Sequence, residues 1–155
     1  MERKVFTTNR KAFHDYEILE KIEAGIVLSG FEVKSIRRSN VSLVDSVVRF
    51  SAGEAYADNM FIAPYEHMSS HVSDYDAKRK RKLLMNKSEI NKWNAKVKEK
   101  GLTVIPLEVY LSAQGMVKVL LGLAKGKRSY DKKESIKRKD MDRDMARERQ
   151  LTINK

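Results

Sequence analysis

Residues 102–126 read LTVIPLEVYLSAQGMVKVLLGLAKG, and this stretch decides the predicted fold. Two runs rich in Val, Ile and Leu flank the polar segment SAQG at residues 112–115. Runs of this composition favour β-strands, and a short polar segment with a glycine favours a tight turn. The stretch therefore predicts two adjacent antiparallel strands near the end of the main body of the chain.

Earlier segments show the same strand-like pattern. Residues 14–22 (HDYEILEKI) alternate apolar and charged side chains, EAG predicts a turn at Gly25, and IVLS at 26–29 resumes the apolar pattern. Residues 42–50 (SLVDSVVRF) and 54–62 (EAYADNMFI) predict two further short strands joined across SAG. The first dozen residues are polar, and we expect them to be loose.

A short helix is predicted over residues 29–40 (SGFEVKSIRRSN). Ser29 can cap its first turn and Glu32 follows three residues later, which is the spacing of a capping box. Val33 and Ile36 would face inward. The opposite face would carry Lys34, Arg37 and Arg38.

A second helix is predicted over residues 86–101 (NKSEINKWNAKVKEKG). Asn86 would cap it, Glu89 would complete a capping box, and Gly101 would end it. Its apolar stripe consists of Ile90, Trp93 and Val97.

The fold class is therefore mainly β, with about six short strands and two or three helices. Tight turns between successive strands favour antiparallel pairing, and a small set of such strands loses its exposed edges when it closes into a barrel. We expect a small antiparallel closed barrel of the oligonucleotide-binding type, with a β-sandwich as the alternative.

Residues 125–155 differ in composition from the rest of the chain. They carry 12 Lys and Arg residues against 6 Asp and Glu residues, so they hold +6 of the formal net charge of +11. Such a segment cannot bury enough apolar surface to offset the entropy of ordering, but it contains good helix formers and opposite charges at helical spacings. We expect a β-barrel domain at residues 1–124 and a basic C-terminal tail at residues 125–155, which is disordered when free and helical on its partner.

Composition narrows the function classes. The net positive charge points to a polyanionic partner, with nucleic acid ahead of an anionic membrane surface. The chain has no cysteine, which excludes a disulfide framework, a thiolate metal site and a thiol nucleophile. Its start, MERKVFTTNRK, lacks the apolar run of a secretory signal, and no stretch reaches the roughly 20 apolar residues of a membrane span. We therefore expect a cytoplasmic protein.

Catalysis has little support in the sequence. His67 and His71 have a spacing that can bind a metal on a helix, but EHMSSHVSD shows no helical stripe. His14 could act as a general base in an RNA-cleaving site, but no second catalytic group accompanies it. We expect a binding protein that is not an enzyme and carries no cofactor or metal. A histidine- or metal-dependent RNase and a generic single-strand RNA-binding barrel are the alternatives.

Three basic clusters could contact phosphates. They are the run KRKRK at Lys78–Lys82, the helix face with Lys34 and RRS, and KGKR at residues 125–128. Each cluster is either a phosphate contact or a solvated face. Tyr130 stands alone among charged residues, so stacking on a base is the sharper interpretation of that side chain.

Three more residues near the start of the predicted barrel have two interpretations each. His14 and Tyr16 could be core or contact residues. Glu23 is either a turn carboxylate in solvent or an acceptor for a base amino group.

Several segments together resemble the SmpB family, the tmRNA (SsrA RNA)-binding proteins of trans-translation. The resemblance rests on residues 9–46 (NRKAFHDYEILEKIEAGIVLSGFEVKSIRRSNVSLVDS), 79–86 (RKRKLLMN), 101–127 (GLTVIPLEVYLSAQGMVKVLLGLAKGK) and 130–133 (YDKK). These segments follow in order over most of the chain.

The resemblance implies a function in ribosome rescue. The barrel would bind the tRNA-like domain of tmRNA, which carries alanine. The complex with elongation factor Tu would enter a ribosome stalled on an mRNA without a stop codon. The tail would reach the decoding centre and lie as a helix in the empty mRNA channel, which small-subunit RNA lines. No long exposed apolar stripe in the sequence suggests a dimer seam, so we expect a monomer, and we expect no membrane contact.

The resemblance also assigns residues. It implies tmRNA contacts at Asn9, Lys11, His14, Tyr16, Glu23, Leu84, Asn86, Lys118, Lys125 and Lys127. It implies ribosome contacts in the tail at Tyr130, Asp131, Lys132, Lys133, Lys137, Arg138, Arg143 and Arg147. Lys133 stands where the family commonly has Arg, which removes the planar fork for bidentate contact. Tyr130 stands where His is common and cannot become a cation near neutral pH, and Ala77 stands where proline is usual.

Overall fold

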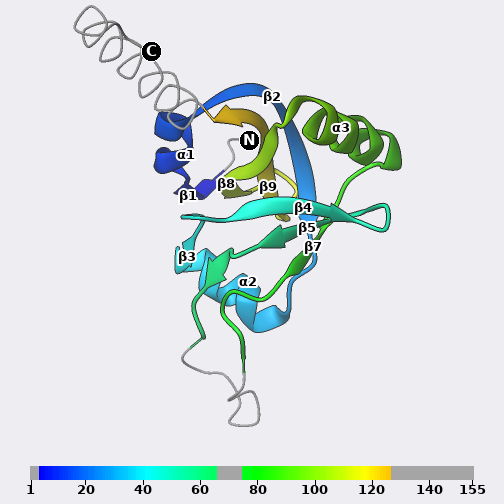
Figure 1. Ribbon diagram of the computed structural model, residues 1–155. Coiled ribbons are helices and arrows are strands. Elements are labelled where there is room, and N and C mark those ends of the chain that lie inside the picture. Colours follow the sequence, from blue (N-terminus) through cyan, green and yellow to red (C-terminus); the bar gives the residue numbers. More distant parts are fainter. Residues whose placement is uncertain (1–3, 66–74, 127–155) are drawn as a thin grey trace, which may run out of the picture.

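The computed structural model describes residues 4–65 and 75–126, which form nine strands and three helices (Figure 1). The strands are β1 (Lys4–Thr8), β2 (Tyr16–Ile26), β3 (Val41–Ser42), β4 (Val47–Ser51), β5 (Glu54–Asp58), β6 (Phe61–Ile62), β7 (Arg81–Leu84), β8 (Thr103–Leu111) and β9 (Val117–Gly126). The helices are α1 (Arg10–Asp15), α2 (Gly30–Arg37) and α3 (Lys87–Lys100).

Strands β8, β4, β5, β7, β2 and β9 form a ring in that order, and β9 pairs back onto β8 to close it. All of these pairings are antiparallel. Strand β1 pairs with the second half of β8, beyond the single register pair that β4 makes with the same strand. Strands β3 and β6 form a separate small sheet. The predicted closed antiparallel barrel of the oligonucleotide-binding type is confirmed.

The hairpin of β8 and β9 is the longest antiparallel pairing with a tight connection, as the sequence predicts. The N–H of Ser112 donates to the carbonyl oxygen of Met116 at 2.8 Å. Gly115 lies in the turn with φ of +81°, a conformation that glycine adopts at no steric cost. Leu107 and Leu121, one from each strand, are fully buried.

The predicted turn at Gly25 is wrong. Gly25 lies inside β2, where it is in register with Leu84 of β7 on one side and Lys118 of β9 on the other. A Cβ at this position would stand 3.2 Å from Cδ1 of Leu84. The glycine therefore provides space for a neighbouring strand's side chain rather than a change of chain direction.

The expectation of a loose N-terminus is also wrong for the residues that the structure describes. Strand β1 pairs with β8, and Phe6 lies in the main hydrophobic core. Helix α1 follows directly after Asn9. The polar composition reflects a strand that contributes one large apolar side chain to the core, which a hydrophobicity pattern over a dozen residues does not reveal.

The two predicted helices start where their capping boxes indicate. Oε1 of Glu32 accepts from the N–H of Ser29 at 3.0 Å before α2. Oε1 of Glu89 accepts from the N–H of Asn86 at 3.1 Å before α3. Gly101 ends α3 with φ of +65°, a left-handed C-terminal cap.

Helix α3 packs on the barrel through Trp93, which is fully buried. The indole N–H of Trp93 donates to Oε1 of Glu20 on β2 at 3.3 Å, and Lys96 forms an ion pair with the same carboxylate. Ile36 provides the corresponding buried contact of α2, while Val33 is only half-buried. Among the described residues, no helix has the length and apolar character needed to cross a membrane.

Candidate nucleic-acid interface

Asn9 joins α1 to the barrel and has its polar atoms engaged within the protein. Its Nδ2 donates to the carbonyl oxygens of Leu43 at 3.2 Å and Pro106 at 3.0 Å. Its Oδ1 accepts from the N–H of Ala12 at 3.1 Å, which caps α1. Only 5% of the residue is exposed. Asn9 therefore holds α1 in place, and Lys11 and His14 of that helix are exposed.

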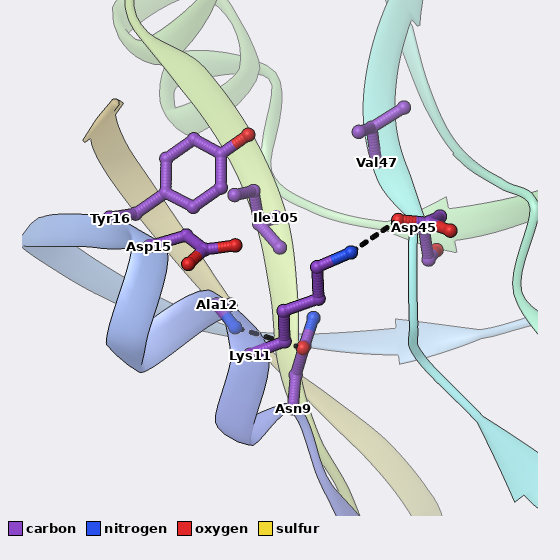
Figure 2. Close-up of a pocket in the computed structure, with 9 residues that line it drawn as sticks. Asn9, Lys11, Ala12, Asp15, Tyr16, Asp45, Val47 and Ile105 are labelled. Atoms are coloured by element: carbon purple, nitrogen blue, oxygen red, sulfur yellow. Dashed lines mark hydrogen bonds and ion pairs between the residues drawn. The ribbon is translucent and has the colours of Figure 1, made fainter. Parts of the chain in front are cut away.

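A cavity of about 250 Å³ opens between α1, β8 and the segment before β4 (Figure 2). Nζ of Lys11 lies 3.2 Å from Oδ1 of Asp45, and both side chains are largely exposed. Asp15 and the ring of Tyr16 border the same space. The complete lining is Asn9, Lys11, Ala12, Asp15, Tyr16, Asp45, Ser46, Val47 and Ile105.

A second, wider hollow of about 550 Å³ lies between β4, the start of β8 and the end of α3. Tyr16 and Val47 line both hollows, so Tyr16 separates two neighbouring depressions of the surface. Arg49 and Lys98 are charged residues in the lining of the second one. Tyr16 is half-buried against a small apolar cluster. It therefore packs on the barrel and also leaves part of its side chain accessible to solvent.

His14 lies in the last turn of α1 in an exposed position, and its Nδ1 lies 2.9 Å from Oδ1 of Asp15. No cluster of three or more potential metal ligands occurs in residues 4–65 and 75–126. His67 and His71 lie outside the described residues, as do Lys127 and all the predicted contacts of the tail from Tyr130 to Arg147.

The other predicted contact residues gather at the far end of β2. Leu84, Gly25 and Lys118 are in register on three neighbouring strands, so their side-chain positions share one face. Leu84 is 55% exposed, which is unusual for a large apolar side chain in a strand. Asn86 follows two residues after Leu84 at the exposed start of α3.

Glu23 belongs to this second group. It is an exposed residue of β2 in register with Leu120, so the interpretation as a turn carboxylate is wrong. Its carboxylate accepts a hydrogen bond from the hydroxyl of Tyr110 on β8. Tyr110 therefore orients Glu23, an arrangement for which the sequence contains no signal.

The predicted sites thus form two groups along one strand. Lys11, His14 and Tyr16 lie at the start of β2, where Lys125 of β9 is in register with Glu17. Glu23, Leu84, Asn86 and Lys118 lie towards its end. From Tyr16 to Glu23 an extended strand spans roughly 20 Å. The two groups together therefore span more than the length of a single nucleotide.

The basic run at Lys78–Lys82 is only in part exposed to solvent. Arg81 is fully buried, and its Nη2 lies 2.6 Å from Oε2 of Glu32. Nη2 of Arg79 lies 2.6 Å from Oε1 of the same carboxylate. Lys80 lies over the ring of Tyr56 at 4.3 Å. Neither interpretation of the run, phosphate contact or solvated face, applies to Arg81, because its guanidinium is buried against the carboxylate of Glu32.

Glu32 is the centre of this buried network. Burial alone would raise the pKa of Glu32, but hydrogen bonds from Arg79, the Ser29 N–H and Arg81 outweigh burial and lower the pKa to about 2. The hydroxyl of Tyr75 donates to Glu32 at 3.0 Å. Burial raises the pKa of Tyr75 to about 12, so this hydroxyl stays protonated. The sequence revealed Glu32 only as a helix-capping residue.

Comparison with known proteins places this architecture in a family. The family model described as SmpB protein matches residues 6–151. The chain belongs to the SmpB family. An SsrA-binding protein of Coprothermobacter proteolyticus is 52% identical over 145 residues, which are 94% of this chain and 96% of that protein. An SsrA-binding protein of a Sulfurihydrogenibium species is 54% identical over 145 residues, with coverage of 94% and 93%.

The fold of the SmpB family is also found among solved structures. A chain described as "tmRNA-SmpB: a journey to the center of the bacterial ribosome" matches with a TM-score of 0.66 and 50% sequence identity. The match covers 85% of this chain and 94% of the solved one. The family model, which matches residues 6–151, extends over the barrel and both groups of candidate contact residues.

Proposed function

We propose that this SmpB-family protein is a tmRNA-binding adaptor of trans-translation, and that it has no catalytic activity of its own. The observation that carries the proposal is membership of the SmpB family over nearly the whole chain, since the relatives are SsrA-binding proteins. The solved neighbour is described as tmRNA–SmpB in the bacterial ribosome. The formal net charge of +11 suits an RNA partner.

The barrel is the part that binds the tRNA-like domain of tmRNA. Lys118 and Lys125 supply positive charge on β9, and the exposed Leu84 offers an apolar contact for a base or sugar between them and α3. Glu23 is an acceptor for base amino groups, oriented by Tyr110. Lys11, His14 and Tyr16 extend the surface to the other end of β2.

The basic tail, residues 125–155, is the part that reads the ribosome. It delivers alanyl-tmRNA, with elongation factor Tu, to ribosomes stalled on an mRNA without a stop codon. Twelve of its side chains are Lys or Arg, so an empty mRNA channel lined by ribosomal RNA attracts it and orders it as a helix. The protein acts as a monomer in the cytoplasm.

A gel-shift series at one fixed salt concentration tests the proposal. The full chain is titrated with tmRNA, a tRNA and an unstructured single strand. We expect clear preference for tmRNA, because the two groups along β2 suit a folded RNA. Equal affinity for the three RNAs would contradict the adaptor function and favour a general single-strand binder.

A pair of variants tests the contact surface. Lys118→Ala removes a cation of the second group, and Lys100→Ala removes an exposed cation at the end of α3 as a matched control. We expect only Lys118→Ala to weaken tmRNA binding and to lower the slope of log affinity against log salt by about 1. If both variants behave alike, the second group is not part of the tmRNA surface.

A further inference from the structure

We propose that the outer face of β4, β5 and β7 binds one unpaired nucleotide of the RNA partner, with its base stacked on Tyr56 and its phosphate held by Lys80. The proposal rests on the proposed function only for the identity of the partner as tmRNA. It adds a contact that neither group of candidate residues along β2 contains. The three strands lie side by side in the barrel ring (Figure 1).

The alternation of side chains along β5 defines this outer face. Ala55 and Ala57 are fully buried, so the side chain of Tyr56 between them points to the opposite side of the sheet. Tyr56 is in register with Arg49 of β4 and with Lys82 of β7. The row across the three strands therefore consists of a half-buried aromatic ring between two exposed cations.

Tyr56 already attracts a cation to its ring. Nζ of Lys80, an exposed residue just before β7, lies 4.3 Å from the ring centroid. Stacking of a base on an aromatic ring is stronger than a cation–π contact at an exposed site, so a base displaces the ammonium group from the ring. Because the lysine side chain is long and flexible, the released ammonium group stays close enough to bind the phosphate of the same nucleotide.

The charges of the face select Lys80 as the phosphate contact. Nζ of Lys82 lies 2.6 Å from Oε2 of Glu54, and Nε of Arg49 lies 2.8 Å from Oδ2 of Asp58. These two cations are therefore compensated by carboxylates of β5. In the part of the chain that the structure describes, no carboxylate pairs with Lys80. The uncompensated positive charge lies beside the ring, which suits a ligand that combines a flat ring with a negative charge.

The face is continuous with the second group of candidate contact residues. Leu84 of that group follows Lys82 by two residues on β7, so the two side chains share one face and lie about 7 Å apart along the strand. The N–H of Val27, just after β2, donates to the carbonyl oxygen of Lys82 at 3.0 Å, and Val27 is 48% exposed. Because these are neighbouring positions of one sheet, RNA that occupies the second group also reaches Tyr56.

Gel shifts of full-chain variants with tmRNA at one salt concentration test the stacking contact. We expect Tyr56→Leu to bind about tenfold more weakly than wild type, because leucine has no ring on which a base can stack. Tyr56→Phe keeps the ring and should bind like wild type. If Tyr56→Leu binds as tightly as wild type, or if Tyr56→Phe binds as weakly as Tyr56→Leu, the proposal is overturned.

Tyr65→Leu is the matched control for the loss of a ring. Tyr65 is also half-buried and also has cations over its ring, Lys34 at 5.5 Å and Arg38 at 5.0 Å, but it lies outside the face of β4, β5 and β7. We expect Tyr65→Leu to bind tmRNA like wild type. An equal loss of affinity in Tyr65→Leu and Tyr56→Leu overturns the assignment to β5.

The substitution Lys80→Ala tests the phosphate contact. We expect the slope of log affinity against log salt to fall by about 1, which is the increment for one phosphate. Lys100→Ala removes an exposed cation at the end of α3 and should leave the slope unchanged. A slope in Lys80→Ala equal to that of wild type contradicts the role of Lys80.

Photocrosslinking identifies the source of the nucleotide. The full chain with Tyr56→p-azidophenylalanine is irradiated with tmRNA alone and with tmRNA and ribosomes, and the crosslinked nucleotides are mapped. We expect a crosslink to an unpaired nucleotide of the tRNA-like domain in both mixtures. A crosslink to a base-paired segment, a crosslink to ribosomal RNA only, or no crosslink to tmRNA overturns the proposal. Preference of the wild-type chain for tmRNA over tRNA tests the proposed function separately, because it does not depend on where Tyr56 crosslinks.

Discussion

Glu32 shows how one residue can hold separate segments of the barrel together. It caps α2 through the Ser29 N–H, and its two oxygens accept from Arg79, Arg81 and Tyr75 in the segment before and within β7. Because Glu32 and Arg81 are both fully buried, neither charge can be solvated if its partner is removed. The network therefore determines which side chains of the basic run face solvent.

The substitution Glu32→Gln should reduce the free energy of unfolding at neutral pH by about 3 to 5 kcal/mol, because it leaves the guanidinium of Arg81 buried without a counter-charge. Urea unfolding followed by the fluorescence of Trp93, the single tryptophan, measures the change. Glu54→Gln removes a carboxylate that pairs with Lys82 near the surface and is the control, with little expected effect.

Comparison of wild-type protein with Glu32→Gln also tests a prediction of how stability depends on pH. The pKa of Glu32 is lowered from 4.5 to about 2 in the folded protein. Because the pKa is lowered on folding, the contribution of Glu32 to the free energy of unfolding is complete above the pKa of the unfolded state. That contribution is lost as the pH falls towards the pKa of the folded state. Wild-type protein should therefore lose on the order of 3 kcal/mol between about pH 4.5 and 2 from this group. If Glu32→Gln shows the same loss over that range, Glu32 is not its source.

At the scale of elements, the pairing of β8 and β9 depends on a close approach at Gly122. A Cβ on this residue would lie 2.7 Å from Cδ1 of Leu107 and 3.2 Å from Cγ2 of Ile18. Leu107 is fully buried, so it has little room to move away. The glycine lets β9 pass close to Leu107 and Ile18, in the small apolar cluster beside α1, without displacing either side chain.

Gly122→Ala should therefore destabilise the barrel by about 1 to 3 kcal/mol, the usual cost of overpacking a core. Gly30→Ala is the matched control, because a Cβ at Gly30 would meet no atom within 4 Å and the residue is in α2. Thermal unfolding of both variants gives the comparison. Equal stability of Gly122→Ala and wild type would show that Leu107 can repack freely.

Elements with local signals were predictable from the sequence. The capping boxes at Ser29 and Asn86 and the turn at Gly115 each depend on residues within a few positions of one another, and all three occur as predicted. Strand β1 and the passage of β2 through Gly25 depend on partners far along the chain. A pattern within a short window carries no information about those partners.

In the candidate site, too, features with local signals were predictable and features that depend on distant partners were not. The family resemblance identified Lys118, Glu23 and Tyr16 as candidates, but only the register of β2 with β7 and β9 shows that they form two separate groups. Arg81 could not be recognised as buried, because its partner Glu32 lies in a different element. Long-range electrostatic pairing therefore limited the prediction more than the secondary structure did.

The whole molecule divides its charge between a folded body and the segment after β9. Strand β9 ends at Gly126, and the barrel ring and its core are complete within residues 4–126. Residues 127–155 carry 11 Lys and Arg residues against 6 Asp and Glu residues, so they hold +5 of the net charge of +11. A body that binds one RNA and a charged segment that binds another would show separate salt dependences, since each phosphate contact adds its own increment to the slope.

A chain ending at Gly126 tests this division of function. We expect it to unfold at the same temperature as the full chain and to bind tmRNA with the same affinity and salt slope, because the proposed tmRNA contacts lie almost entirely on the barrel. We expect it to lose tagging of peptides on stalled ribosomes in a reconstituted translation reaction. A full chain with the order of residues 127–155 scrambled, which keeps their charge, is the control for nonspecific attraction and should also fail to tag. If truncation abolishes tmRNA binding itself, the charged segment belongs to the tmRNA surface, and the two-part division of this molecule is wrong.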